Sequence, residues 1–156
     1  MYKIRLVWVG KTQESYLKEG IQLYLKKLHP YVKVECLEVK PTDYTQGSLE
    51  HWKSTETQRL LKVLPVDETA VFLDERGPAW TSAQLAQWLE AQKRTQLSAI
   101  NFCIGGAYGW DQALLPRNAQ LLSLSPMTFN HQMVRLFLLE QLYRGFTILR
   151  GEPYHH

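Results

Sequence analysis

The chain has 156 residues, of which 45% are hydrophobic and 21% are charged. This length suggests one domain over residues 1–156, and the composition is that of a globular protein rather than a disordered or fibrous one. A formal net charge of +3 permits a nucleic-acid partner without demanding one, because free-standing nucleic-acid binders usually show stronger basic clustering.

The first half of the chain has the pattern strand, helix, strand, helix. Residues 3–10 (KIRLVWVG) are rich in β-branched and aromatic residues, which predicts a strand that ends at a glycine. Apolar residues recur at helical spacing over 12–28, so a helix capped by Thr12 is expected there. A second strand is predicted at 32–39, and a second helix at 52–64.

The second half adds three predicted strands, at 68–75, 99–106 and 119–126. The first of these is short and continuously apolar, as buried parallel strands are. Residues 81–84 (TSAQ) have the pattern of a capping box that opens a helix. Asn130 is a plausible cap for the last long helix, whose first N–H groups would then be free to meet an anionic ligand.

Strands that alternate with helices predict an α/β fold with a mainly parallel sheet and helices on both faces. Ligands bind such sheets beyond the carboxyl ends of the strands. Three loops there are unusual, at 74–77 (DERG), 105–109 (GGAYG) and 125–129 (SPMTF). The glycine-rich loop lacks the spacing of a dinucleotide-binding fingerprint, so a tight turn and a ligand-binding loop are equally compatible with it.

The helix predicted at 130–146 is apolar in nearly every direction. Such a helix is buried on all sides, which predicts contact with the sheet on one side and with a second subunit on another. His131 and Arg135 are four residues apart and share a face of this helix. Glu140 and Arg144 have the same spacing and are expected to form a structural ion pair.

Both cysteines, Cys36 and Cys103, lie in apolar, strand-like runs. Two buried thiols in a reducing cytoplasm are therefore expected rather than a disulfide or a metal site. The short N-terminal apolar run is interrupted by charges, and no run has transmembrane length, so we expect a cytoplasmic protein without a membrane partner. No histidine spacing indicates a metal site.

Five segments together resemble the ribosomal large-subunit pseudouridine methyltransferase H family, a minimal branch of the SPOUT superfamily. They are KIRLVWVGK, TAVFLDERG, FCIGGAYG, LSLSPMTFNHQMVRLFLLEQLYRGFTI and the terminal GEPYHH. The resemblance covers essentially the whole chain, and the order and joint occurrence of the segments make it specific. It implies a fold whose C-terminal part forms a trefoil knot, a homodimer, and S-adenosylmethionine as the cofactor.

The reaction implied by the resemblance is methyl transfer to N3 of a pseudouridine in the helix 69 hairpin of large-subunit (23S) rRNA, on the assembled ribosome. The implied cofactor contacts are Leu73, Gly105, Leu124, Ser125, Pro126, Met127, Thr128 and Phe129. We expect the tail to lie across a cofactor pocket, of its own or a partner subunit, where Tyr154 and His155 position or deprotonate the pseudouridine. His131 is a further catalytic candidate, and Arg135 and Arg144 are candidates for RNA contact.

Two other functions compete with this interpretation. A SPOUT methyltransferase for another RNA, such as a tRNA, is disfavoured by the lack of an RNA-binding extension. A non-catalytic ribosome-binding factor on the same fold is disfavoured by the intact glycine loop and tail, which a binding module does not need. The affinity for the cofactor would separate an enzyme from a binding factor.

Overall fold

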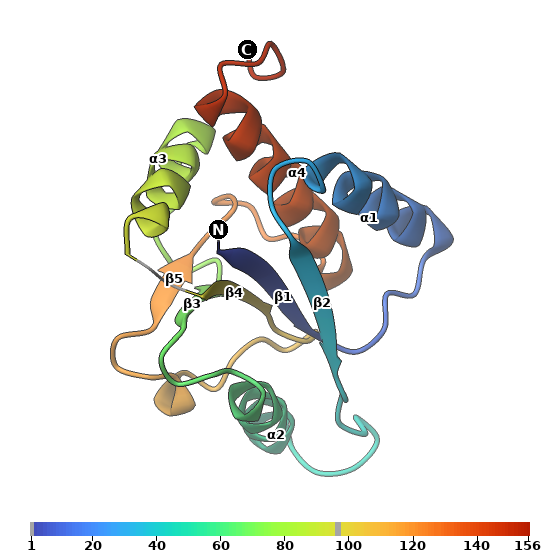
Figure 1. The fold of residues 1–156 in the computed structure, drawn as a ribbon. Helices are drawn as coiled ribbons and strands as arrows, with labels where there is room; N and C mark the ends of the chain where they lie inside the picture. Colours follow the sequence, from blue (N-terminus) through green and yellow to red (C-terminus); the bar gives the residue numbers. More distant parts are fainter. Residues whose placement is uncertain (1, 96–97) are drawn as a thin grey trace.

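A computed structural model describes residues 2–95 and 98–156 of the chain (Figure 1). Five strands form one sheet in the order β2-β1-β4-β3-β5, and every neighbouring pair is parallel. The strands are β1 (Lys3–Val9), β2 (Val34–Val39), β3 (Thr69–Leu73), β4 (Ala99–Ile104) and β5 (Gln120–Leu122). The helices are α1 (Ser15–Leu28), α2 (Leu49–Lys62), α3 (Ser82–Lys93) and α4 (His131–Leu149), with a short 3-10 helix η1 at Gln112–Leu114.

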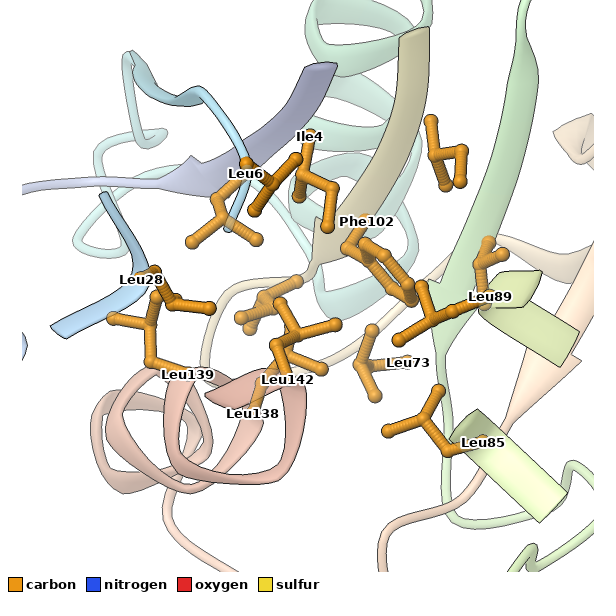
Figure 2. Packing of buried hydrophobic residues seen from close by; sticks show 14 of the residues in the cluster. Ile4, Leu6, Leu28, Leu73, Leu85, Leu89, Phe102, Leu138, Leu139 and Leu142 are labelled. Atoms are coloured by element: carbon orange, nitrogen blue, oxygen red, sulfur yellow. The ribbon is translucent and has the colours of Figure 1, made fainter. Parts of the chain in front are cut away.

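Helices cover both faces of the sheet, which confirms the predicted α/β architecture. In Figure 1, α1, α3 and α4 lie on one face and α2 lies on the other. The larger core packs leucines of α1, α3 and α4 against strand residues such as Phe102, as Figure 2 shows. Leu138, Leu139 and Leu142 of α4 are fully buried there. Each such leucine contributes about 1.5–3 kcal/mol of transfer free energy, so α4 is a main support of the sheet.

Two of the three predicted helix caps are confirmed. The Gln84 backbone N–H donates to Thr81 Oγ1 at 3.1 Å, and the Thr81 N–H donates to Gln84 Oε1 at 2.8 Å, which completes the capping box. The Gln132 N–H donates to Asn130 Oδ1 at 2.8 Å at the start of α4. The predicted cap at Thr12 is wrong, because α1 begins at Ser15 and the buried Thr12 hydroxyl accepts a hydrogen bond from Arg135 at 3.0 Å instead.

Some element boundaries also differ from the predictions. The second helix begins at Leu49 rather than residue 52, because Ser48 accepts a hydrogen bond from the His51 N–H and caps it. The last strand is shorter than predicted and ends at Leu122. Ser123 forms only an isolated parallel bridge with Ala79, and its hydroxyl donates to the Ser125 carbonyl at 2.7 Å.

Most apolar side chains of α4 pack against other parts of the same chain. Both α1 and α3 pack along α4. A Cβ on Gly20 of α1 would lie 2.9 Å from Leu136, and a Cβ on Gly145 of α4 would lie 3.2 Å from Leu89 of α3, so both contacts depend on glycine. The sheet and these two helices account for most of the apolar residues, and a second subunit on α4 stays a prediction.

The two cysteines differ from each other. Cys103 lies in the central strand β4 and is fully buried, as predicted. The prediction of a buried Cys36 is wrong. β2 is an edge strand, and Cys36 and its neighbour Leu37 are both exposed. In the part of the chain that the structure describes, no helix has the length and apolarity needed to span a membrane.

Candidate active site

A cavity of about 530 Å³ opens where β3, β4 and β5 end. Its lining comes from the three loops that follow these strands and from the first turns of α4, and it includes Leu73, Gly105, Leu124, Ser125, Met127, Thr128, Phe129 and His131. Pro126 is the one residue of the expected cofactor set that does not line it. The volume is that of a typical small-molecule site. Parallel strands bring these loops to one edge, so a ligand here would touch all three.

Trp110 fixes two of the loops to each other. Its indole N–H donates to the Leu73 carbonyl at 2.9 Å, and its ring packs edge-on against Phe72 at 5.3 Å. The ring is 2% exposed, so Trp110 is a structural residue that also forms a wall of the cavity. This role could not be predicted from the sequence, because a tryptophan after a glycine loop could equally face solvent.

Asp74 places a negative charge in the cavity wall. Its carboxylate accepts hydrogen bonds from the Arg76 side chain at 3.0 and 3.1 Å and from Gln112 at 2.8 Å. Burial alone would raise the pKa of the Asp74 carboxyl, but the hydrogen bonds and the positive charge of Arg76 lower it overall. Asp74 is therefore ionised at neutral pH, and its side chain is only 5% exposed. Because Arg76 also lines the cavity and pairs with this carboxylate at 3.0 Å, the two charges offset each other and the pair forms a polar part of the wall.

The glycine loop lies against a buried carboxylate on its other side. Oε2 of Glu56 in α2 accepts hydrogen bonds from the Thr42 N–H at 3.0 Å and from the Tyr44 hydroxyl. Oε1 has no partner among the described residues and would lie 2.6 Å from a Cβ placed on Gly106. Position 106 therefore needs glycine, and Glu56 is a supporting residue of the site that no motif in the sequence indicated.

Replacing Gly106 with alanine is expected to destabilise the fold by about 1–3 kcal/mol, because a buried carboxylate and the Tyr44 hydroxyl must move to admit the methyl group. Denaturant unfolding measures this change in the free energy of unfolding. Ala107→Ser, at an exposed position of the same loop, is the matched control and should stay within about 0.5 kcal/mol of the wild type. Equal stability of the Gly106 variant and the control would contradict the tight contact.

The loop from β5 to α4 is ordered by its own polar side chains. The Met127 N–H donates to Ser125 Oγ at 2.9 Å, and the Thr128 hydroxyl bonds to the carboxylate of Glu75 in the loop after β3. The loop nevertheless exposes apolar surface, since Met127 is 75% and Phe129 is 37% exposed. Two large apolar side chains beside a cavity are available to a ligand or to a partner subunit.

His131 is the titratable residue of α4 that lines the cavity. Burial lowers the pKa of its imidazole, the charge of Arg135 lowers it further, and Glu56 opposes both. The pKa therefore lies below the ordinary value of 6.5, and the ring is neutral at pH 7. A neutral imidazole beside a ligand cavity is able to accept a proton.

Arg135 does not fit the expected RNA contact. Its side chain is fully buried, and its guanidinium donates to the Val9 carbonyl at 2.7 Å, the Gly10 carbonyl at 3.0 Å and Thr12 Oγ1 at 3.0 Å. It also stacks 4.9 Å from the ring of Trp8. Burial lowers its pKa to about 10, so it remains charged at neutral pH. Arg135 thus anchors the start of α4 to the end of β1, and its side chain offers no exposed surface for RNA in this structure.

The C-terminal tail lies at the other end of α4 from the cavity (Figure 1). Tyr154 donates to Glu140 Oε1 at 3.0 Å and packs edge-on against Tyr143 at 4.7 Å. The helix has 19 residues, so the tail begins about 27 Å from His131. In this chain the tail therefore packs against α1 and α4 and does not cover the cavity of its own subunit.

Arg144 links the tail to the helix. Its guanidinium forms the predicted ion pair with Glu140 at 2.6 Å, which is confirmed, and contacts His155 Nδ1 at 3.2 Å. It also stacks 4.8 Å from the Tyr154 ring. Burial, together with hydrogen bonds to Tyr24 and Glu140, raises the pKa of the Tyr154 phenol, so the phenol is neutral. Tyr154, His155 and Arg144 form one polar cluster, although only the first two are adjacent in sequence.

No group of three or more histidine, cysteine or acidic side chains within residues 2–95 and 98–156 is arranged to hold a metal ion. The candidate site consists of a cavity, whose wall holds the Asp74–Arg76 ion pair and the neutral imidazole of His131, and of a separate polar tail.

The family described as "Predicted SPOUT methyltransferase" matches residues 2–155 of the chain. Curated relatives are similar over almost their whole length. A protein of Geotalea daltonii is 44% identical over 154 residues, and one of Geobacter sp. strain M21 is 45% identical over 154 residues, with 99% of both chains covered in each case. A protein of Halothermothrix orenii is 43% identical, with 98% of this chain and 99% of the relative covered. All three are named ribosomal RNA large subunit methyltransferase H. The fold, the cavity at the strand ends and these matches together show that the chain belongs to the SPOUT methyltransferase family.

Proposed function

We propose that the protein transfers a methyl group from S-adenosylmethionine to N3 of a pseudouridine in the helix 69 hairpin of 23S rRNA, on the assembled ribosome in the cytoplasm. The observation that carries this proposal is the cavity at the ends of β3, β4 and β5, which is lined by all but one of the residues expected to bind the cofactor. The relatives' names support an rRNA methyltransferase, and the cavity supports one that binds a small cofactor.

The cavity suits this cofactor in size and polarity. About 530 Å³ is enough for a nucleoside joined to an amino acid, and Gly105 and Gly106 line it without side chains. Leu73, Leu124 and the backbone of 105–109 would hold it. The Asp74–Arg76 pair in the wall would offer hydrogen bonds to its polar groups. When bound, S-adenosylmethionine supplies an activated methyl group on a sulfonium sulfur.

The residues of the chain must then align N3 with the methyl group and remove the N3 proton. The neutral imidazole of His131 lines the cavity and is placed to accept that proton. The neutral phenol of Tyr154 is a hydrogen-bond donor that could orient the uracil ring. In this proposal, His131 in the cavity accepts the proton, and Tyr154 in the tail, with His155 beside it, positions the uracil ring.

The rate of methyl transfer should fall on the acid side through the pKa of His131, because only the neutral imidazole accepts a proton. Since burial holds this pKa below 6.5, the wild-type rate should stay flat down to a pH under that value. His131→Gln is expected to lower kcat by about 100-fold and to remove this acid limb. Single-turnover rates measured across pH test this. A limb that survives unchanged in the variant would assign the base to the tail.

A homodimer explains how the tail could reach a cavity, because the tail begins about 27 Å from the cavity-lining His131 of its own chain. We propose that each tail serves the cavity of the partner subunit. Met127 and Phe129 support this arrangement, because they expose apolar surface beside the cavity where a second subunit would cover it. The trefoil knot that the family resemblance implies also stays a prediction for this chain.

The modest net charge of +3 fits an enzyme that recognises a composite ribosomal surface rather than bare RNA. Arg144, which is part of the tail cluster, remains a candidate for RNA contact at the composite site. A non-catalytic docking factor would not need a neutral imidazole and a buried carboxylate around a cavity, so the site favours the enzyme.

Transfer of labelled methyl from S-adenosylmethionine tests the proposal, with assembled ribosomes, isolated large subunits and bare rRNA as parallel substrates. We expect label at N3 of a pseudouridine in helix 69, and only with assembled ribosomes. Label in a tRNA fraction would show a different RNA substrate. If no RNA is labelled while calorimetry shows that the cofactor binds, the protein is a docking factor and the proposed activity is wrong.

A further inference from the structure

Three aromatic side chains form a cluster next to the cavity, which we call the aromatic shelf and define as Tyr44, Trp52 and Tyr108. The ring centroids lie 5.3 Å apart for Tyr44 and Trp52, and 5.1 Å apart for each of the other two pairs. Tyr108 belongs to the glycine loop and also lines the cavity. The shelf is therefore continuous with the rim of the proposed cofactor site.

Hydrogen bonds within the chain fix the polar groups of Tyr44 and Trp52. The Tyr44 hydroxyl donates to the buried Glu56 carboxylate, and the Trp52 indole N–H donates to the Gln46 carbonyl at 2.5 Å. Glu56 is 1% exposed and also holds the Thr42 backbone, so this support is rigid. With the polar edges occupied in this way, the shelf presents aromatic surface whose orientation is set before any ligand arrives.

A purely structural role accounts for Tyr44 and Trp52, because they hold the 40–48 loop on α2. It does not account for Tyr108, which is 44% exposed. The glycine loop is already secured by the Gly109 N–H to the Gly106 carbonyl at 3.1 Å, and by the Asp111 N–H to Thr57 Oγ1 at 3.0 Å. Tyr108 packs on the other two rings and still exposes much of its own ring at the cavity rim, which leaves aromatic surface available to another molecule there.

One cationic side chain lies near the shelf. The Arg59 guanidinium donates to the carbonyls of Lys40 and Pro41 at 3.1 and 3.0 Å, beside the loop that carries Tyr44. The Asp43 carboxylate of that loop accepts hydrogen bonds from the Thr45 N–H and hydroxyl, which hold it against its own loop. Aromatic rings are the surface on which proteins stack unpaired bases, and arginine adds to such a surface.

We propose that the aromatic shelf stacks an unpaired nucleobase of the RNA substrate that neighbours the target nucleotide. Proteins recognise RNA sequence mainly in unpaired loops, where splayed bases stack on aromatic side chains. A base held on Tyr108 would lie at the cavity rim while the target nucleotide enters the cavity. The inference rests on the proposed function, because it takes RNA as the substrate, but it assigns a contact that the methyl-transfer site does not require.

Ultraviolet cross-linking tests the contact directly. The wild-type protein is irradiated with assembled ribosomes in the presence of S-adenosylhomocysteine, and nucleotide adducts are mapped on its peptides by mass spectrometry. We expect adducts on Tyr108 or Trp52. Adducts confined to other peptides would overturn the shelf as an RNA contact.

Kinetics with variants give a second test. Tyr108→Ala should raise the KM for ribosomes by about 10-fold, the scale of one lost base–aromatic stack. Tyr108→Phe keeps the ring and is the matched control, with a KM within about 2-fold of the wild type. Calorimetry measures the affinity of each protein for S-adenosylmethionine. If Tyr108→Ala weakens cofactor binding as much as it raises the KM, the ring serves the cofactor and the proposal fails.

The two proposals fail in different ways. Methylated rRNA without adducts on the shelf would overturn the shelf alone. Adducts on the shelf without methylation of any RNA would overturn the proposed activity alone. The absence of both would overturn both.

Discussion

Removing residues 154–156 is expected to lower methyl transfer to ribosomes by about 1,000-fold, while the affinity for S-adenosylmethionine changes by less than about 2-fold. The tail begins about 27 Å from His131, so its removal leaves the cavity of its own subunit intact. The catalytic loss would come from the missing phenol and imidazole at the uracil ring. Labelled-methyl assays and calorimetry on the same preparation measure the two quantities.

Point variants separate the contribution of the Tyr154 hydroxyl from that of the His155 imidazole. Tyr154→Phe removes the hydroxyl that donates to Glu140 but keeps the ring that packs on Tyr143, and His155→Ala removes the imidazole beside Arg144. Each should retain the melting temperature of the wild type within about 2 °C and lose a part of the activity. Near-normal turnover by the truncated protein would contradict a catalytic role for the tail.

Mixed dimers show which subunit the tail serves. One chain lacks residues 154–156, and the other carries Gly105→Val. Even a Cβ at position 105 would lie 3.3 Å from the Trp110 ring, so the valine methyl groups would displace this wall of the cavity. Each variant alone should be inactive. If the tail acts in the partner's cavity, co-expression restores roughly a quarter of wild-type activity, because half of the dimers are mixed and each has one complete site. No recovery would mean that cavity and tail act within one chain.

The position of the cavity could be predicted from the sequence because it depends on topology. Strands alternating with helices imply a parallel sheet, and a parallel sheet brings loops at 74–77, 105–109 and 125–129 to one edge whatever the details of packing. Caps such as Thr81 and Asn130 could be predicted for a similar reason, since they depend on residues within one turn of each other.

The burial and position of a residue could not be predicted where they depend on which distant part of the chain packs against it. Cys36 and Cys103 lie in similar apolar runs, and only the order of the strands makes one an edge and the other central. In the sequence, Glu56 has the pattern of an ordinary acidic residue on an amphipathic helix. Its burial depends on the 40–44 loop, whose Thr42 and Tyr44 donate hydrogen bonds to it. The distance from the tail to the cavity depends on the length and direction of α4, which spacing along the chain does not encode.

The burial of Arg135 could not be predicted for the same reason. Its four-residue spacing from His131 suggested a shared polar face for RNA, yet His131 lines the cavity while Arg135 is fully buried against the end of β1. Two residues one helical turn apart diverge here because the loop between β1 and α1 crosses over the second of them. Gln132 strengthens the same junction, since it donates to the Lys11 carbonyl at 3.1 Å and accepts from the Gln13 N–H at 3.1 Å.

Replacing Arg135 with methionine is therefore expected to lower the free energy of unfolding by about 3 kcal/mol, because three hydrogen bonds from a buried charge are lost and two carbonyls are left without that donor. For a chain of this length the melting temperature should fall by about 6–12 °C. Calorimetric and denaturant unfolding measure these changes. Methionine keeps the volume of the side chain, so the loss reports the polar contacts rather than a cavity.

Arg144→Met is the matched control on the same helix. Its guanidinium is part-exposed and pairs with a part-exposed carboxylate, so its removal should cost less than about 1 kcal/mol. The two arginines should also differ in function. Arg144→Met is expected to weaken turnover on ribosomes with little change in stability, whereas Arg135→Met should lose stability and, through the displaced start of α4, affinity for S-adenosylmethionine. A stable Arg135→Met protein that binds the cofactor normally but no longer binds ribosomes would reverse the assignment and make Arg135 an RNA contact after all.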